Sequence, residues 1–119
     1  MRAYSYEGIG QWAATFACEE VRAGQVVKVS GDGTVSGCGA GERFAGVALS
    51  VGRDGAACAV ALGGMATAAY SGETAPKAGW CALTADGQGG VTAAEGAAGG
   101  REYLVAEVDT AAKTVTFVL

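Results

Sequence analysis

The chain has 119 residues, the size of one domain, and 21 of them are glycine. Half of the residues are hydrophobic and 17% are charged, a balance that excludes an intrinsically disordered chain. The net charge is −4 and no Lys or Arg cluster occurs, which argues against nucleic acids and anionic membrane surfaces as partners. We therefore expect one β domain over residues 1–119 with a thin core of small side chains.

The first twenty residues hold two segments of different character. Residues 1–10, with Tyr4 and Tyr6, alternate only weakly, and we expect an N-terminal arm there that a partner would order; a disordered tail is the alternative. Residues 11–20 predict a strand with Trp12 and Phe16 on one face, although a helix is the alternative because Ala and Glu favour it. The arm lacks the apolar stretch of a secretory signal, so we expect the chain to be made in a cytoplasm.

Short β segments separated by glycine turns follow. The segments that predict further strands are 25–30, 34–36, 65–70, 79–85 and 91–93. The one proline of the sequence lies in the predicted loop 71–78, and a short helical turn is left open within 94–100 or 13–22. No apolar run approaches the ~20 residues of a membrane-spanning helix. This pattern predicts an all-β fold with little helix, a small β-barrel or sandwich of about ten short strands.

The clearest element is a hairpin over Phe44–Leu62 that turns at 52–55, because apolar residues alternate along both strands and an Asp-Gly link joins them. The residues expected to face inward are Val47, Leu49, Val51, Cys58, Val60 and Leu62. The C-terminal segment repeats this hairpin 57 positions later without a gap. Its corresponding residues are Leu104, Ala106, Val108, Val115, Phe117 and Leu119.

The correspondence continues upstream of the two hairpins. Residues 22–24 match residues 77–79, and each triplet is followed by a strand and an Asp-Gly turn. A slip of one residue would turn every side chain to the wrong face, so a register kept over the hairpin predicts a shared structure. We therefore predict two related β-units around a shared core; chance similarity among segments rich in Ala, Gly and Val is the alternative.

The four cysteines lie about twenty residues apart, at positions 18, 38, 58 and 81. Zinc sites favour paired ligands such as C-x-x-C, and the sequence has no such pair. We expect thiols that lie in the core or in loops and behave as small apolar groups. A disulfide remains an alternative, since the sequence does not give the distances between cysteines.

No arrangement of residues points to catalysis. The sequence has no histidine, so neither Ser-His-Asp nor Cys-His catalysis is available. The candidate carboxylate pairs, Glu19 with Glu20 and Glu102 with Glu107, occupy positions that we expect to be solvated. The glycine runs 31–33 and 37–41 lack the following helix that a phosphate-binding loop requires. We expect no catalytic residue, metal or cofactor, and hence a protein that is not an enzyme.

Four segments of the chain resemble the head decoration, or capsid cement, proteins of tailed bacteriophages and prophages. They are AGQVVKVSGDGTV (23–35), FAGVALSVGRDGAACAVALGGMAT (44–67), KAGWCALTADGQGGVT (77–92) and EYLVAEVDTAAKTVTFVL (102–119). The resemblance spans residues 11–119 and rests on patterns of small residues. It implies a β-barrel-like or sandwich domain that binds the outer surface of the capsid shell, commonly as a trimer. The implied partner is the major capsid protein, and the implied location is the virion.

Two expectations about contacts complete the interpretation. We place a shell contact on the N-terminal arm, at Tyr4 and Tyr6, because an extended arm with aromatic residues can add a strand to a neighbouring sheet edge. The alternative function is a soluble β-barrel module that binds a small ligand or carbohydrate, with Trp12 and Trp80 as stacking candidates. Both indoles lie in strand-like alternation, where we expect core burial instead.

Overall fold

The computed structural model describes residues 12–94 and 101–119, and these form ten β-strands and no helix. The strands are β1 (Trp12–Glu19), β2 (Val26–Gly31), β3 (Thr34–Gly37), β4 (Gly46–Val51), β5 (Ala57–Gly63), β6 (Met65–Ala69), β7 (Gly79–Ala85), β8 (Val91–Ala93), β9 (Arg101–Asp109) and β10 (Thr114–Val118). The predicted all-β fold of about ten short strands is confirmed. The helix considered for residues 13–22 is wrong, because β1 covers most of that segment.

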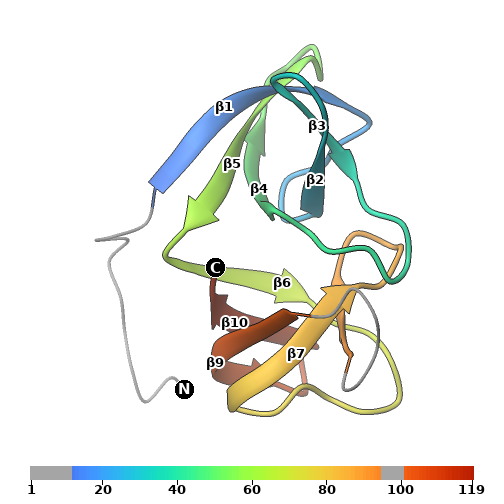
Figure 1. Cartoon of the computed structure of the whole chain (residues 1–119), viewed down its shortest axis with the longest axis vertical. Helices are drawn as coiled ribbons and strands as arrows, with labels where there is room; N and C mark the ends of the chain where they lie inside the picture. Colours follow the sequence, from blue (N-terminus) through green and yellow to red (C-terminus); the bar gives the residue numbers. More distant parts are fainter. Residues whose placement is uncertain (1–11, 95–100) are drawn as a thin grey trace.

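The first unit, β1 to β5, is a closed barrel with strand order β1-β3-β2-β4-β5. β1 closes it by pairing in parallel with β3 and antiparallel with β5 (Figure 1). Closure leaves no unpaired strand edge in this unit. The interior is filled by small side chains, namely Cys18, Val21, Val27, Val35, Ala48, Cys58 and Val60.

The second unit, β6 to β10, is a five-stranded sheet with order β6-β10-β9-β7-β8. The sheet curls until the residue after β6 meets β8, where Tyr70 and Val91 form an isolated parallel bridge. The backbone N–H of Ser71 donates to the carbonyl oxygen of Val91 at 2.9 Å beside this bridge. The second unit is therefore nearly closed, by the same kind of parallel contact that closes the first.

The two units repeat one topology. Replacing β1 to β5 by β6 to β10 in chain order turns the first order into β6-β8-β7-β9-β10. This is the order of the second unit read as a ring in the opposite direction, with the Tyr70–Val91 bridge joining the end of β6 to β8. The hairpins also agree residue by residue, since Ala48 pairs with Val60, and Val105 with Phe117, at an offset of 57. The predicted pair of related β-units is thus present in the fold, and Figure 1 shows one unit above the other.

The inward faces of β4 and β9 differ from the prediction because each strand carries a β-bulge at the equivalent residue, Leu49 or Ala106. A bulge adds one residue to a strand and reverses the alternation beyond it. Ala48 and Val105 therefore face the interiors, whereas Leu49 is 43% exposed. The prediction was wrong for Leu49, Leu104 and Ala106, which are exposed. On the return strands it holds for Cys58, Val60, Val115 and Phe117, which are buried.

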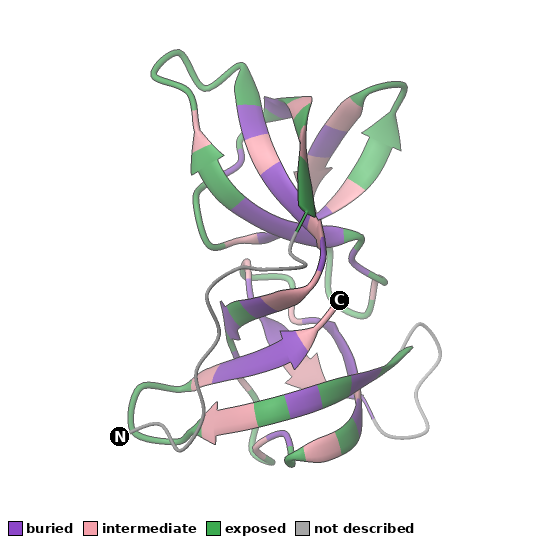
Figure 2. Cartoon of the chain, turned by 90° about the vertical axis from the view of Figure 1, so that its left-hand side faces the viewer, coloured by how far each residue is buried: buried purple, intermediate pink, exposed green. Residues whose placement is uncertain are grey.

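The two units share a core at their junction. The ring of Phe44, from the segment before β4, stacks on Tyr103 with centroids 5.1 Å apart and meets Phe117 edge-on at 5.8 Å. Val26 and Val47 of the first unit belong to the same buried cluster. Backbone hydrogen bonds cross the junction as well, from Gly41 N–H to the Ala85 carbonyl at 2.9 Å and from Ala85 N–H to the Glu42 carbonyl at 3.0 Å. Figure 2 shows buried residues in both units and around this junction.

Candidate functional surfaces

Reactive side chains do not gather in the part of the chain that the structure describes. Within residues 12–94 and 101–119, no group of three His, Cys, Asp or Glu side chains is placed to hold a metal ion. Glu19 and Glu20 are exposed at the end of β1, and Glu102 is exposed on β9. These carboxylates lie at the surface, as the sequence predicted, and not in an enclosed site where proton transfer would be favoured.

The four cysteines are free and buried, so the predicted apolar role of the thiols is confirmed and the disulfide alternative is not realised. Burial raises the pKa of the Cys38 thiol to about 11. Burial, together with a hydrogen bond to Cys18, raises the pKa of Cys58 to about 11. Because the thiolate is the form that attacks electrophiles and binds metals, these raised pKa values favour the protonated, less reactive form of both groups at neutral pH.

Positive charges meet in a shallow hollow at the junction of the units. Its lining consists of Lys28, Val29, Arg43, Phe44, Ala45 and Arg101. The Lys28 ammonium donates to both Glu42 carboxylate oxygens, at 2.8 and 2.9 Å, and this contact raises the pKa of Lys28 and lowers that of Glu42. The Arg101 guanidinium lies 4.8 Å from the centroid of the Tyr103 ring. Arg43 also interacts with the Tyr103 side chain, so all three cations have partners within the chain, which accounts for them structurally.

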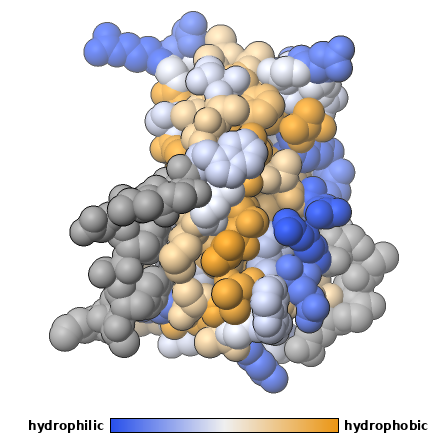
Figure 3. Space-filling view, turned by 60° about the vertical axis from the view of Figure 1, so that its left-hand side comes forward, coloured by the Kyte–Doolittle hydropathy of each residue, from blue (hydrophilic) through white to orange (hydrophobic). Residues whose placement is uncertain are grey.

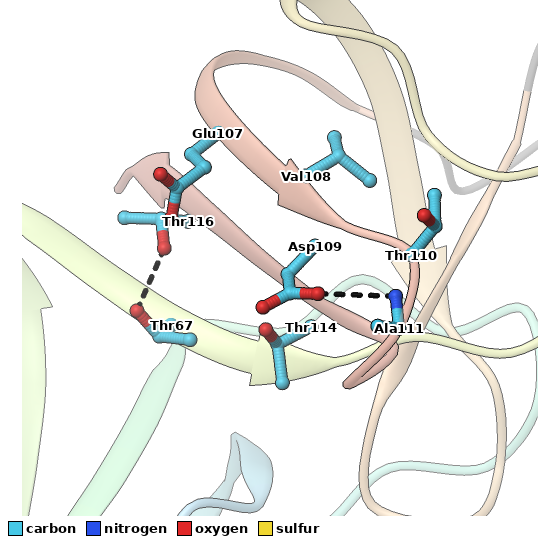
Figure 4. A pocket seen from close by; sticks show the side chains of 8 residues that line it. All are labelled: Thr67, Glu107, Val108, Asp109, Thr110, Ala111, Thr114 and Thr116. Atoms are coloured by element: carbon cyan, nitrogen blue, oxygen red, sulfur yellow. Dashed lines mark hydrogen bonds between the residues drawn. The ribbon is translucent and has the colours of Figure 1, made fainter. Parts of the chain in front are cut away.

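A polar groove runs along the outer face of β6, β10 and β9 (Figure 4). Its volume is about 520 Å³, and its lining is Thr67, Glu107, Val108, Asp109, Thr110, Ala111, Thr114 and Thr116. The Asp109 carboxylate accepts from the backbone N–H groups of Ala111 and Ala112 at 3.0 Å, so it holds the β9–β10 turn. The hydroxyls of Thr67 and Thr116 are 2.9 Å apart and hydrogen-bonded. The Asp109 carboxylate and the hydroxyls of Thr67 and Thr116 therefore already have hydrogen-bond partners within the fold.

Replacing Thr67 with valine should lower the free energy of unfolding by about 1–2 kcal/mol, because the buried Thr116 hydroxyl loses this partner. Replacing both threonines with valine should cost less than the single change, because the two shapes are kept and neither hydroxyl remains to be satisfied. Urea unfolding of the two variants measures both values. A double variant with a lower free energy of unfolding than Thr67→Val would contradict this account.

Large apolar side chains are exposed on both units. The exposed fractions are 59% for Trp12, 53% for Val29 and 71% for Trp80, and Leu104 is 42% exposed. The prediction of buried indoles is therefore wrong. Trp12 is the first residue of β1 and pairs with Gly63 of β5. Its indole covers Gly63, so that a Cβ at Gly63 would collide with it. In Figure 3 apolar side chains form a strip down the middle of one face that spans both units.

The predicted contact residues differ in where they fall. Tyr4 and Tyr6 lie outside the described residues. Trp12 is on β1 of the first unit and Trp80 is on β7 of the second, and neither indole lines the hollow or the groove described above. Alternation alone did not reveal their exposure, because alternation identifies two faces of a strand but not which face is covered.

Comparison of the chain with protein-family models and with curated protein sequences gives no match. Among the described residues, no helix is long and apolar enough to cross a membrane. The case for a function therefore depends on the fold, on its surfaces and on the sequence patterns described above.

Proposed function

We propose that this chain is a structural protein of a phage or prophage particle, which binds the outer surface of the capsid shell and stabilises it. The observation that carries the proposal is a pair of related β-units with exposed Trp and Leu side chains and no group of metal-ligating side chains in the described residues. Such a molecule has exposed apolar side chains that can bind a partner, and its described residues supply few groups for catalysis. The sequence resemblance to capsid decoration proteins supports the same conclusion.

The physical role would be thermodynamic. A protein that binds the assembled, expanded shell better than any other state stabilises that shell by mass action. The partner would be the major capsid protein, and the decoration protein would act as a trimer, without nucleic acid, membrane or cofactor. The arm with Tyr4 and Tyr6 would supply part of the shell contact.

Three observations test this function. The gene should lie beside a gene for a major capsid protein. Purified protein should co-sediment with expanded shells built from that neighbouring capsid protein and raise their melting temperature, while unexpanded shells bind less. Removal of residues 1–10 should weaken the co-sedimentation without changing the melting temperature of the free protein. Absence of binding to expanded shells at saturating protein would refute the proposal.

A binding module for a carbohydrate is the second candidate, and the exposure of both indoles favours it. Stacking against a sugar would quench the fluorescence of Trp12 or Trp80. Titration with a panel of mono- and oligosaccharides should leave the emission unchanged if the structural function is right. Saturable quenching that is lost in the Trp12→Ala or Trp80→Ala variant would establish the alternative.

A further inference from the structure

Trp80 and Leu104 form an exposed apolar pair on the second unit. They are direct cross-strand partners, Trp80 on β7 and Leu104 on β9. Their neighbours in sequence, Cys81 and Val105, face the interior and are buried. The pair therefore points away from the core of its own unit, with an indole that is mostly in water.

The first unit has the same pair at the equivalent place, and there it is covered. Val26 and Val47 are cross-strand partners on β2 and β4, and Leu104 follows Val47 by 57 residues. Both valines are buried, although they too point away from the interior of their barrel. What covers them is the second unit, because they belong to the cluster that contains the second unit's core.

We propose that Trp80 and Leu104 are covered by the first unit of a second copy of this chain, which continues the contact that already exists between the two units. The established junction supplies the argument for this occupant. The two outward pairs lie on equivalent strands, β2 with β4 in the first unit and β7 with β9 in the second. In the described residues, the pair of the first unit is covered by the second unit, which is a unit of this same fold.

The junction also indicates which part of the second copy would take part. Within the chain, the β7–β8 turn lies against the start of β2, and the Gly89 carbonyl accepts from the Val26 N–H at 2.9 Å. The equivalent turn of the first unit joins β2 to β3 at residues 32–33. Val29, close to this turn, is 53% exposed. The second copy would thus place its β2–β3 turn and Val29 against Trp80 and Leu104.

This contact uses different surfaces on the two partners, so it is heterologous and joins copies head to tail. Such a contact forms a ring if its rotation closes and an open chain if it does not. The inference concerns self-association in solution, and it stands or falls independently of whether the chain binds a shell.

Mixing of two variants tests the proposal. Trp80→Glu places a charge in the surface formed by Trp80 and Leu104, and Val29→Glu places one in the surface formed by the β2–β3 turn and Val29. Both positions are exposed, so each variant should fold. At high micromolar concentration, native mass spectrometry and sedimentation equilibrium should give wild type the mass of two or more copies of the 11.7 kDa chain. Each variant alone should associate at least about thirtyfold more weakly, which is the effect of losing one central anchor residue. An equimolar mixture should form a one-to-one dimer and nothing larger.

Trp12→Glu is the matched control, since it removes an exposed indole that lies outside the proposed contact. It should associate like wild type. The far-ultraviolet circular dichroism of every variant should match that of wild type. A monomeric wild type, unchanged association of Trp80→Glu, or a mixture that stays monomeric would each overturn the proposal. A monomeric wild type whose Trp80→Glu variant loses shell binding would instead assign this pair to the capsid protein.

Discussion

Replacing Phe44 with alanine is expected to lower the free energy of unfolding by about 4 kcal/mol, the typical cost of removing a large buried aromatic side chain. Phe44 is almost completely buried and stacks on Tyr103 while meeting Phe117 edge-on. It comes from the first unit but fills the core of the second. Its loss leaves a cavity where the two units join, and the total stability of a domain is only about 5–15 kcal/mol.

The same substitution should also separate the unfolding of the two units. Trp12 is on the first unit and Trp80 on the second, so the variants Trp80→Phe and Trp12→Phe each leave one fluorescent reporter. In these backgrounds the two guanidinium transitions should coincide when Phe44 is present and separate when it is alanine. Phe16→Ala, which removes a ring packed on the first barrel's own core, is the control and should leave the transitions coincident. Coincident transitions in the Phe44→Ala proteins would contradict a shared core that depends on this ring.

Replacing Gly46 with alanine is expected to cost about 3 kcal/mol, at the upper end of the usual cost of overpacking a core. A Cβ at Gly46 would collide with the carbonyl oxygen of Ala61 and would lie 2.8 Å from a methyl carbon of Val60. Both partners are held in β5, and the carbonyl is backbone, so neither moves aside easily. Equilibrium unfolding in urea measures the change.

Gly31→Ala is the matched control for this prediction. Gly31 ends β2, and a Cβ there would meet only the Cβ of Thr34, at 4.0 Å. Its stability should stay within about 0.5 kcal/mol of wild type, or rise slightly because alanine restricts the unfolded chain. Equal free energies of unfolding for Gly46→Ala and Gly31→Ala would contradict the close approach of β4 to β5 at Gly46.

The sequence predicted the fold class and the repeat because both depend on local patterns. Alternating apolar residues mark strands, and glycine marks turns, so ten strands and two matching hairpins could be read directly. The offset of 57 proved structural, down to equivalent bulges at Leu49 and Ala106. The bulges themselves leave no signal in alternation, which explains why the inward faces of β4 and β9 were assigned wrongly.

The surfaces were less predictable, because exposure depends on which units meet. Val26 and Trp80 occupy equivalent places, yet one is buried and the other is exposed, since only the first has a neighbouring unit over it. Closure of the first barrel depends on the pairing of β1 with β3, a contact set by tertiary structure and not by any short motif. The absence of histidine, in contrast, could be read at once, and it was the basis for expecting neither Ser-His-Asp nor Cys-His catalysis.

The most direct measurement for the proposed function is a cryo-electron microscopy reconstruction of expanded shells incubated with the purified chain. The shells should be assembled from the major capsid protein encoded beside it. The account predicts additional density on the outer surface, at repeated positions over joints between capsid subunits, into which the two β-units fit. Bare shells at saturating protein, or density on the inner surface, would contradict a decoration protein.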